Sequence, residues 1–214
     1  MSHCHDEHCE HDHDDLPESG EQFLLYSKID LDNVRCLNES ELDSGKSVIR
    51  PWNQRLEDSK FVESDVDEQL IFFIPFTGSV KLRSICLRTD PSDSAPSKMK
   101  VFINRNDVDF DVADSYTPIQ EFELVEGSNE VVEYGTKITK FSSVTSITLF
   151  FPENFGQDDT SIVRFIGFKG EWTEVGLLSL MSIYAFIHIF YEANANPADH
   201  KIPGAENKMN HSIQ

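Results

Sequence analysis

The sequence predicts an all-β fold, an antiparallel sandwich of many short strands. Apolar runs of strand length recur roughly every 10–20 residues, and clusters of turn-forming residues separate them. No stretch of helical periodicity lies between these runs, so the crossover helices of βαβ units are not expected. The 214 residues are enough for one sizeable domain with tails.

The clearest strand signal is the run Leu-Ile-Phe-Phe-Ile at residues 70–74. It is apolar on both faces, which predicts a central strand. Pro75 and Gly78 are expected to end this strand, because proline cannot donate to a sheet ladder and glycine marks turns. Residues 80–87 predict the next strand, and the first ordered residues are expected near Phe23.

Further strands are expected along the rest of the chain. Phe122 and Leu124 alternate with Glu121 and Glu123, a pattern typical of a half-buried strand. Short runs of the same kind lie at residues 99–103, 131–134, 145–151 and 162–168, and a loop is expected at residues 90–96. This succession of short strands favours a sandwich.

Two polar tails are expected to flank the domain. Residues 1–20 are rich in His, Asp and Glu and have almost no apolar content, which predicts a disordered tail. Residues 203–214 are expected to form a mobile C-terminal tail. The folded domain is therefore expected to span residues 21–202.

The chain is strongly acidic, with 18 Lys and Arg against 38 Asp and Glu and a formal net charge of −20. This argues against a nucleic-acid partner, whose phosphates are bound by Lys and Arg, and against anionic membranes. It fits a soluble protein, expected to be a monomer, that meets a basic or mixed-charge protein surface. The alternative, that the acidity serves solubility alone, stays open.

The N-terminal tract carries candidate metal ligands, namely His3, Cys4, His5, His8, Cys9, His11 and His13. Imidazole and thiolate groups bind zinc, copper and nickel. A structural zinc site usually needs a second ligand pair further along the chain, and the sequence offers none. We interpret the tract as a low-complexity tail that binds metal opportunistically, and we expect no cofactor.

Deleting residues 2–15 is expected to leave the melting temperature nearly unchanged, because a disordered tail buries little surface. The same deletion is expected to abolish retention on a nickel or zinc column. Thermal unfolding and column retention of the two proteins measure these effects. A large loss of melting temperature, with stabilisation of the intact protein by added zinc, would indicate a structural metal site instead.

Cys36 and Cys86 lie in apolar runs, where cysteine behaves as a small buried hydrophobe. A reactive thiolate needs a neighbouring cation or a helix N-terminus. Arg35 is adjacent to Cys36, but neighbours along a strand point to opposite faces. No secretory signal and no Cys-x-x-Cys motif are recognised, so we expect a reducing compartment without disulfide bonds.

Asp107, Asp109 and Asp111 have the spacing that begins a calcium-binding loop. Val112 and Pro118 occupy the positions that such a loop gives to Gly and Glu, so calcium binding is not expected. The alternation of carboxylates with apolar residues instead predicts a solvated face of a strand or loop.

A second acidic cluster, Glu63, Asp65, Asp67 and Glu68, precedes the strand at residues 70–74. Carboxylates serve as general acids when an apolar pocket raises a pKa, which a sequence cannot show. We interpret the cluster as an exposed recognition loop for a protein partner.

Trp52 and Trp172 stand beside polar residues and are candidates to anchor a partner or to stack on a sugar. The alternative is packing in the core with the indole N–H satisfied. No hydrolase, P-loop or dinucleotide-binding motif is recognised, so the chain is not expected to be an enzyme.

Seven short motifs follow one another along the chain. They are Cys36-Leu-Asn-Glu-Ser40, Lys60-Phe-Val-Glu-Ser-Asp65, Ile74-Pro-Phe-Thr-Gly78, Lys137-Ile-Thr-Lys-Phe141, Asn154-Phe-Gly156, Gly170-Glu-Trp-Thr173 and Asn196-Pro-Ala-Asp-His200. In this series the chain closely resembles the PITH domain, the proteasome-interacting thioredoxin-associated module, over residues 23–202. It is most similar to stand-alone members of that family, which begin with a His-rich tail and have no thioredoxin domain.

The resemblance implies an antiparallel β-sandwich of the jelly-roll, galactose-binding-like type. It also implies a non-enzymatic role in docking on the 19S regulatory particle of the 26S proteasome, in the cytoplasm and nucleus. His200, in the last motif, joins the candidate partner-binding residues. Fold analogy alone suggests an alternative function, a small-ligand or carbohydrate-binding sandwich.

Residues 175–190 depart from the family pattern, which has a shorter strand here. The segment is almost wholly apolar, yet it falls short of the ~20 residues that a transmembrane helix needs. Two interpretations stay open: a genuine strand or buried helix of the fold, or the product of an incorrect gene model.

Overall fold

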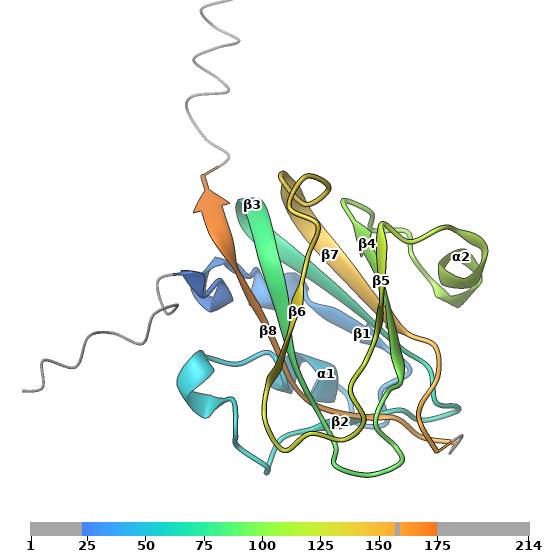
Figure 1. Cartoon of the computed structure of the whole chain (residues 1–214). Helices are drawn as coiled ribbons and strands as arrows, with labels where there is room; N and C mark the ends of the chain where they lie inside the picture. Colours follow the sequence, from blue (N-terminus) through green and yellow to red (C-terminus); the bar gives the residue numbers. More distant parts are fainter. Residues whose placement is uncertain (1–22, 157–158, 175–214) are drawn as a thin grey trace, which may run out of the picture. The chain divides into compact units, whose positions relative to one another are not determined.

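The structure, a computed structural model, describes residues 23–156 and 159–174, which form an antiparallel β-sandwich as predicted (Figure 1). The strands are β1 (Arg35–Leu37), β2 (Val62–Glu63), β3 (Leu70–Thr89), β4 (Lys98–Ile103), β5 (Gln120–Glu123), β6 (Val132–Gly135), β7 (Val144–Phe151) and β8 (Ile162–Thr173). The short helices are η2 (Tyr26–Lys28), η3 (Leu31–Asn33), α1 (Ser44–Ser47), η4 (Trp52–Gln54) and α2 (Phe110–Ser115). The predicted tails and the segment 175–190 lie outside the described residues.

The long strand β3 belongs to both layers of the sandwich. Its first half pairs with β1 and β7, and its second half pairs with β6 and β8. The path of paired strands is β2-β8-β3-β7-β4-β5, with β1 and β6 also joined to β3. One strand therefore holds the two layers together.

The prediction that Pro75 and Gly78 end the first strand is wrong, because β3 continues through both residues. The register of β3 against β7 shifts between Pro75 and Val80, so the missing proline N–H falls where this ladder is already interrupted. Gly78 is needed for a different reason. A Cβ at this position would lie 2.5 Å from the indole Nε1 of Trp172, so glycine lets that ring pack on the backbone.

The remaining strand predictions are confirmed, with one extension. The runs at residues 99–103, 121–124, 131–134 and 145–151 correspond to β4, β5, β6 and β7. The last run predicted a strand to residue 168, whereas β8 continues to Thr173. Residues 90–96 form the expected loop.

One hydrophobic core lies between the layers. Its largest fully buried side chains include Phe72 in β3, Phe151 in β7 and Phe168 in β8. Phe72 and Phe151 meet edge to face, with ring centroids 5.8 Å apart. Aromatic pairs in this geometry add to the stabilisation that area burial provides.

A second, smaller cluster lies on the outer face of β3, β4 and β7, where α2 covers it (Figure 1). Ala113 of α2 packs there with Phe102 and Phe150. The prediction of a solvated strand or loop at residues 107–111 is therefore wrong where α2 begins. The Asp109 carboxylate accepts a hydrogen bond from the Val112 N–H at 2.9 Å, which makes it the N-cap of this helix.

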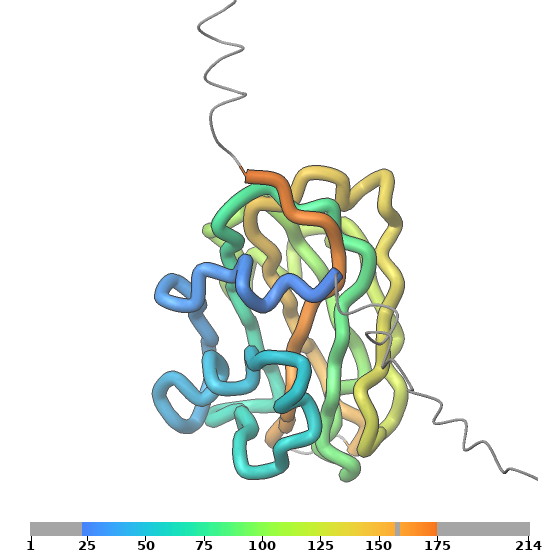
Figure 2. Tube along the Cα trace, turned by 90° about the vertical axis from the view of Figure 1, so that its left-hand side faces the viewer, coloured from blue at the N-terminus to red at the C-terminus, as the bar shows by residue number. Residues whose placement is uncertain are grey.

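The first part of the described chain, residues 23–69, gathers on one side of the sandwich (Figure 2). It is tied to β8 by isolated bridges, including Leu24 with Lys169 and Ile49 with Ile166. None of the helices in the described part of the chain has the length and apolar character needed to cross a membrane.

Candidate interaction surface

The predicted acidic cluster is only partly an exposed loop, because Glu63 belongs to β2 and is half-buried. Asp65, Asp67 and Glu68 lie in the loop that connects β2 to β3, and Asn38 fixes the shape of this loop. The Asn38 side-chain amide donates to the carbonyl oxygens of Asp67 and Gln69 at 3.1 and 2.7 Å and to the Asp67 carboxylate at 2.8 Å. Its side-chain oxygen accepts from the Val66 N–H at 3.1 Å. Asn38 has φ of 67°, a left-handed conformation that asparagine tolerates better than most residues. The loop is thus held from a position distant in sequence.

Glu39 fixes the neighbouring segment in the same way. Its carboxylate accepts hydrogen bonds from the backbone N–H groups of Asp43 and Gly45 at 2.9 and 2.7 Å, at the start of α1. Ser64 anchors the other side, because its hydroxyl accepts from the Ser161 N–H at 2.8 Å while its own N–H donates to the Ser161 carbonyl. Asn38, Glu39 and Ser64 all belong to the first two motifs, and all three are used to build the scaffold.

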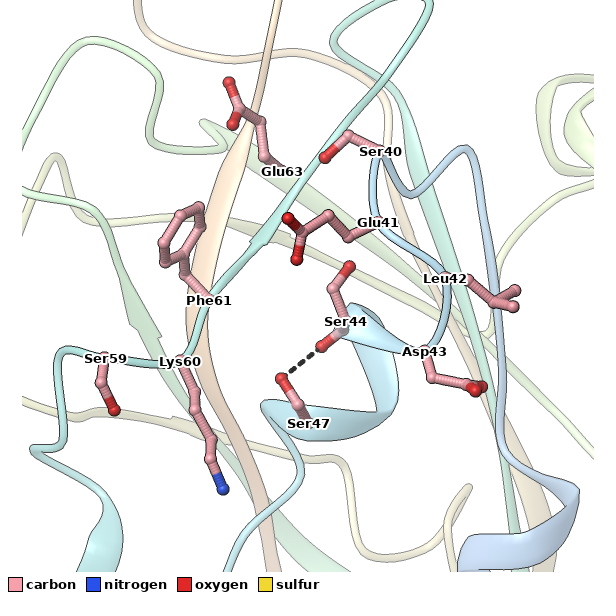
Figure 3. Close-up of a pocket in the computed structure, with 10 residues that line it drawn as sticks. All are labelled: Ser40, Glu41, Leu42, Asp43, Ser44, Ser47, Ser59, Lys60, Phe61 and Glu63. Atoms are coloured by element: carbon pink, nitrogen blue, oxygen red, sulfur yellow. Dashed lines mark hydrogen bonds between the residues drawn. The ribbon is translucent and has the colours of Figure 1, made fainter.

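These segments enclose an open pocket of about 340 Å³ (Figure 3). Residues 40–44 and Ser47 line one side, and Ser59, Lys60, Phe61 and Glu63 line the other. The Ser47 hydroxyl donates to the Ser44 carbonyl at 2.7 Å, a hydrogen bond between the two ends of the short helix α1. The pocket therefore lies between the first two motifs, next to the acidic loop.

Trp52 lies in η4, away from this pocket, on the outer face of β8. Its ring meets Phe165 edge to face at 6.1 Å. The Arg55 guanidinium and the Lys169 ammonium also lie over it, at 4.6 and 5.0 Å from the ring centroid. The ring is therefore engaged by residues of its own chain.

Trp172 lies at the far end of β8. Its ring packs on Gly78, and the Lys28 ammonium lies 4.0 Å from its centroid. The indole N–H is buried without a hydrogen-bond partner among the described residues, so the predicted satisfied indole is not seen. On the same strand, Ile162 lies ten residues before Trp172 and pairs with Glu63 of the acidic cluster. Ten residues of strand span roughly 30 Å, so Trp172 is far from the acidic loop. The structure does not bring the predicted partner-binding residues onto one surface.

Sequence reasoning missed three arginines that clamp residues 50–61 onto the sandwich. The Arg50 guanidinium is almost fully buried and donates to the carbonyl oxygens of Glu57 and Arg164 at 3.2 and 2.7 Å. Arg88 donates to the Asp58 carboxylate and to the Asn129 carbonyl. Arg164 donates to the Asp58 carbonyl and to the Asp90 carboxylate. Burial lowers the pKa of Arg50. No motif marks these arginines, because most of their acceptors are backbone carbonyls.

The variant Asp58→Asn is expected to unfold more easily than the unchanged protein at neutral pH. The hydrogen bond and charge of Arg88 hold the pKa of Asp58 below its ordinary value of 3.8. A carboxyl group with a lowered folded-state pKa adds stability above its unfolded pKa and loses it as the pH falls through the folded-state pKa. The difference between the two proteins should be small, because Asp58 is exposed, and should shrink below about pH 3.8. Urea unfolding over a pH series measures it, and a pH-independent difference would contradict this account.

The two described cysteines are free thiols. Burial, assisted by the negative charge of Glu133, raises the pKa of Cys86 to about 12. Burial and the carboxylate of Glu39 raise the pKa of Cys36 further still. Both side chains are therefore neutral at physiological pH, in line with the interpretation that they pack as small hydrophobes.

Among residues 23–156 and 159–174, no group of three or more His, Cys, Asp and Glu side chains is placed to hold a metal ion. The predicted ligands of the N-terminal tract lie outside this range, and so does His200. Their predicted roles remain predictions.

Comparison with known proteins gives a consistent result. A family model described as PITH domain matches residues 15–181. A PITH domain-containing protein of Drosophila melanogaster is 44% identical over 203 residues, covering 93% of this chain and 92% of that protein. PITH domain-containing protein 1 of Homo sapiens is 41% identical over 208 residues, covering 94% and 95% of the two chains.

The fold also has solved counterparts. CBM32-3 from a family 31 glycoside hydrolase of Clostridium perfringens superposes with a TM-score of 0.51 at 10% identity, covering 72% of this chain and 99% of that one. At this identity the likeness shows the fold alone, a galactose-binding-like β-sandwich, in agreement with the predicted fold class.

Proposed function

The chain belongs to the PITH domain family, and from this premise we propose that it is a non-enzymatic protein-interaction module that docks on the 19S regulatory particle of the 26S proteasome. We further propose that it acts in the cytoplasm and nucleus. The observation that supports docking most directly is the acidic surface next to the first two motifs, where Glu41, Asp43, Asp65 and Asp67 are exposed. Such a surface suits a basic or mixed-charge protein partner.

The chemistry of the site supports a binding role over a catalytic one. Asn38, Glu39 and Ser64 direct their side chains at backbone groups of the scaffold. The raised pKa values of Cys36 and Cys86 keep both thiols from acting as nucleophiles at neutral pH. The polar groups thus hold a shape, which is what a docking module requires.

Affinity purification of the tagged full-length chain in the presence of ATP, followed by mass spectrometry, tests the proposal. Subunits of the regulatory particle should be enriched over two controls, the tag alone and an unrelated protein of similar net charge. The second control separates specific docking from non-specific capture by acidity. Recovery of no regulatory-particle subunit above these controls would overturn the proposal.

A carbohydrate-binding role is the second candidate, and its support is the galactose-binding-like fold. Sugar stacking requires an accessible aromatic face, whereas Trp52 is covered by Arg55 and Lys169 and Trp172 by Lys28. A glycan array probed with the intact protein decides between the two. A signal abolished by Trp52→Ala in a folded protein would favour sugar binding, and a blank array would remove this candidate.

A further inference from the structure

Two large apolar side chains stand exposed in the pocket between the first two motifs. Leu42, in the turn before α1, is 89% exposed, and Phe61, just before β2, is 42% exposed. A single exposed apolar residue is ordinary on a protein surface. Both line the same pocket, Phe61 on one side and Leu42 on the turn opposite, where the Leu42 side chain points away from Phe61 (Figure 3). Exposed aromatic and aliphatic side chains that flank one site are typical of protein interfaces.

The charge of this pocket is one-sided. Glu41, Asp43 and Glu63 line it, and Lys60 is the only cation among its ten lining residues. Within the part of the chain that the structure describes, none of these three carboxylates takes part in an ion pair. Asp65 and Asp67 of the adjoining loop add further negative charge nearby, because both residues are hydrogen-bonded to Asn38 of the first motif. Glu41, Asp43 and Glu63 are therefore available to pair with cations of a binding partner.

The pocket is also held in shape before any partner arrives. Glu39 fixes the turn that carries Leu42, through its hydrogen bonds to the N–H groups of Asp43 and Gly45. Ser64 fixes β2 beside Phe61. The Arg164 guanidinium lies 5.6 Å from the centroid of the Phe61 ring, farther than the cations that cover Trp52 and Trp172, and Phe61 stays 42% exposed. A preformed surface loses little conformational entropy on binding, which favours affinity.

We propose that this pocket, together with the anchors Leu42 and Phe61, is the docking surface of the domain. Its occupant is a short segment of the partner protein in which Lys or Arg residues flank an apolar side chain. The apolar side chain packs on Phe61, the segment continues over the turn that carries Leu42, and the cations meet Glu41, Asp43 and Glu63. The identity of the partner as a regulatory-particle subunit rests on the function proposed above, whereas the chemistry of the occupant rests on the pocket itself.

The first experiment compares two variants with matched controls in capture of purified regulatory particle. Leu42→Ser with Phe61→Ser removes the anchors, and Glu41→Lys with Glu63→Lys reverses the charge. Each should weaken capture by about tenfold or more. The controls, Val125→Ser with Ile138→Ser and Glu126→Lys with Glu130→Lys, change exposed residues of the same kind outside the pocket and should capture normally. Circular dichroism verifies that every variant is folded.

This capture experiment tests the docking surface separately from the proposed function. If the unchanged protein captures the regulatory particle and the pocket variants capture it equally well, this surface is wrong while the function stands. Added salt should weaken capture by the unchanged protein, because it screens the attraction between the carboxylates and the cations of the partner. It should have little effect on the residual capture by the charge-reversed variant. A salt effect of the same size in both proteins would count against the proposal.

The second experiment needs no proteasome. The ¹⁵N-labelled full-length chain is titrated with a short synthetic peptide in which a central leucine is flanked by arginines. Amide shifts should concentrate at residues 40–47 and 59–63, and should weaken strongly for a control peptide in which serine replaces the leucine. Shifts spread over all acidic segments, such as residues 107–114, or shifts independent of the leucine would overturn the proposal, whatever the capture experiment shows.

Discussion

The variant Phe72→Ala is expected to lower the free energy of unfolding by about 3–5 kcal/mol. Phe72 is fully buried in the half of β3 that pairs with β7, and its ring meets that of Phe151 at the centre of the core. Removing the ring forfeits its transfer free energy, leaves a cavity and abolishes the edge-to-face contact. Domains are typically stable by only ~5–15 kcal/mol, so this single change removes a large share of the total.

The neighbouring residue provides a matched control for this variant. Phe73 points to the opposite face of β3, where it is half-buried beneath the Arg35 guanidinium at 4.4 Å. Phe73→Ala should therefore cost far less, about 1–2 kcal/mol. Urea unfolding of the two variants measures both values. Equal losses would show that the two faces of β3 are not buried as differently as the structure indicates.

The positions of most strands follow from sequence alone, and the structure gives the reason. In residues 120–123 the pattern of alternating exposure matches the alternation of Glu with apolar residues, because successive side chains of a strand point to opposite faces. Residues 70–74 are apolar on both faces because one face meets the main core, while on the other face Ile71 meets the cluster under α2 and Phe73 lies beneath Arg35. At residues 70–74 and 120–123 the pattern of apolar residues in the sequence therefore matches the packing of the side chains in the fold.

Two features of the fold differ from the prediction made from the sequence, and each difference has a physical reason. Proline normally ends a central strand, but Pro75 sits where β3 exchanges partners and the ladder with β7 is interrupted. At residues 107–111 a short alternation of carboxylates and apolar residues fits either a strand or a helix start. Aspartate is favoured at the N-cap of a helix, so Asp109, whose carboxylate caps α2, is the residue type in this segment that indicates the helix start.

The candidate site was predictable in part. The acidic composition of residues 63–68 predicts an exposed loop, and residues 65–67 are exposed beside a pocket, whereas Glu63 belongs to β2 and Ser64 is buried. Its conformation depends on Asn38, and the clamp at Arg50 depends on a carbonyl 114 residues away in Arg164. Contacts of this kind join a side chain to a backbone group, which any residue supplies, so residue types alone do not reveal them. The pocket itself arises only when two motifs distant in sequence are folded together.

The variant Gly170→Ala is expected to lower the free energy of unfolding by about 2–3 kcal/mol, an effect large for the addition of one methyl group. Gly170 pairs with Leu82 where β8 crosses the second half of β3. A Cβ at this position would lie 2.4 Å from the backbone carbonyl oxygen of Lys81 and 3.1 Å from the Cα of Leu82. Both atoms belong to a paired backbone that cannot move aside as a flexible side chain would, so the two strands must separate locally.

Gly135→Ala separates this steric effect from the general effect of replacing glycine in a strand. Gly135 lies in β6, also paired with β3, but a Cβ there would meet no atom within 4 Å. Alanine at this position should leave stability unchanged or raise it slightly, because it restricts the unfolded chain. Thermal and urea unfolding of the two variants measure the difference. If Gly170→Ala proves as neutral as Gly135→Ala, then β3 and β8 do not approach as closely as the structure places them, and the motif Gly170-Glu-Trp-Thr173 must be explained by something other than strand packing.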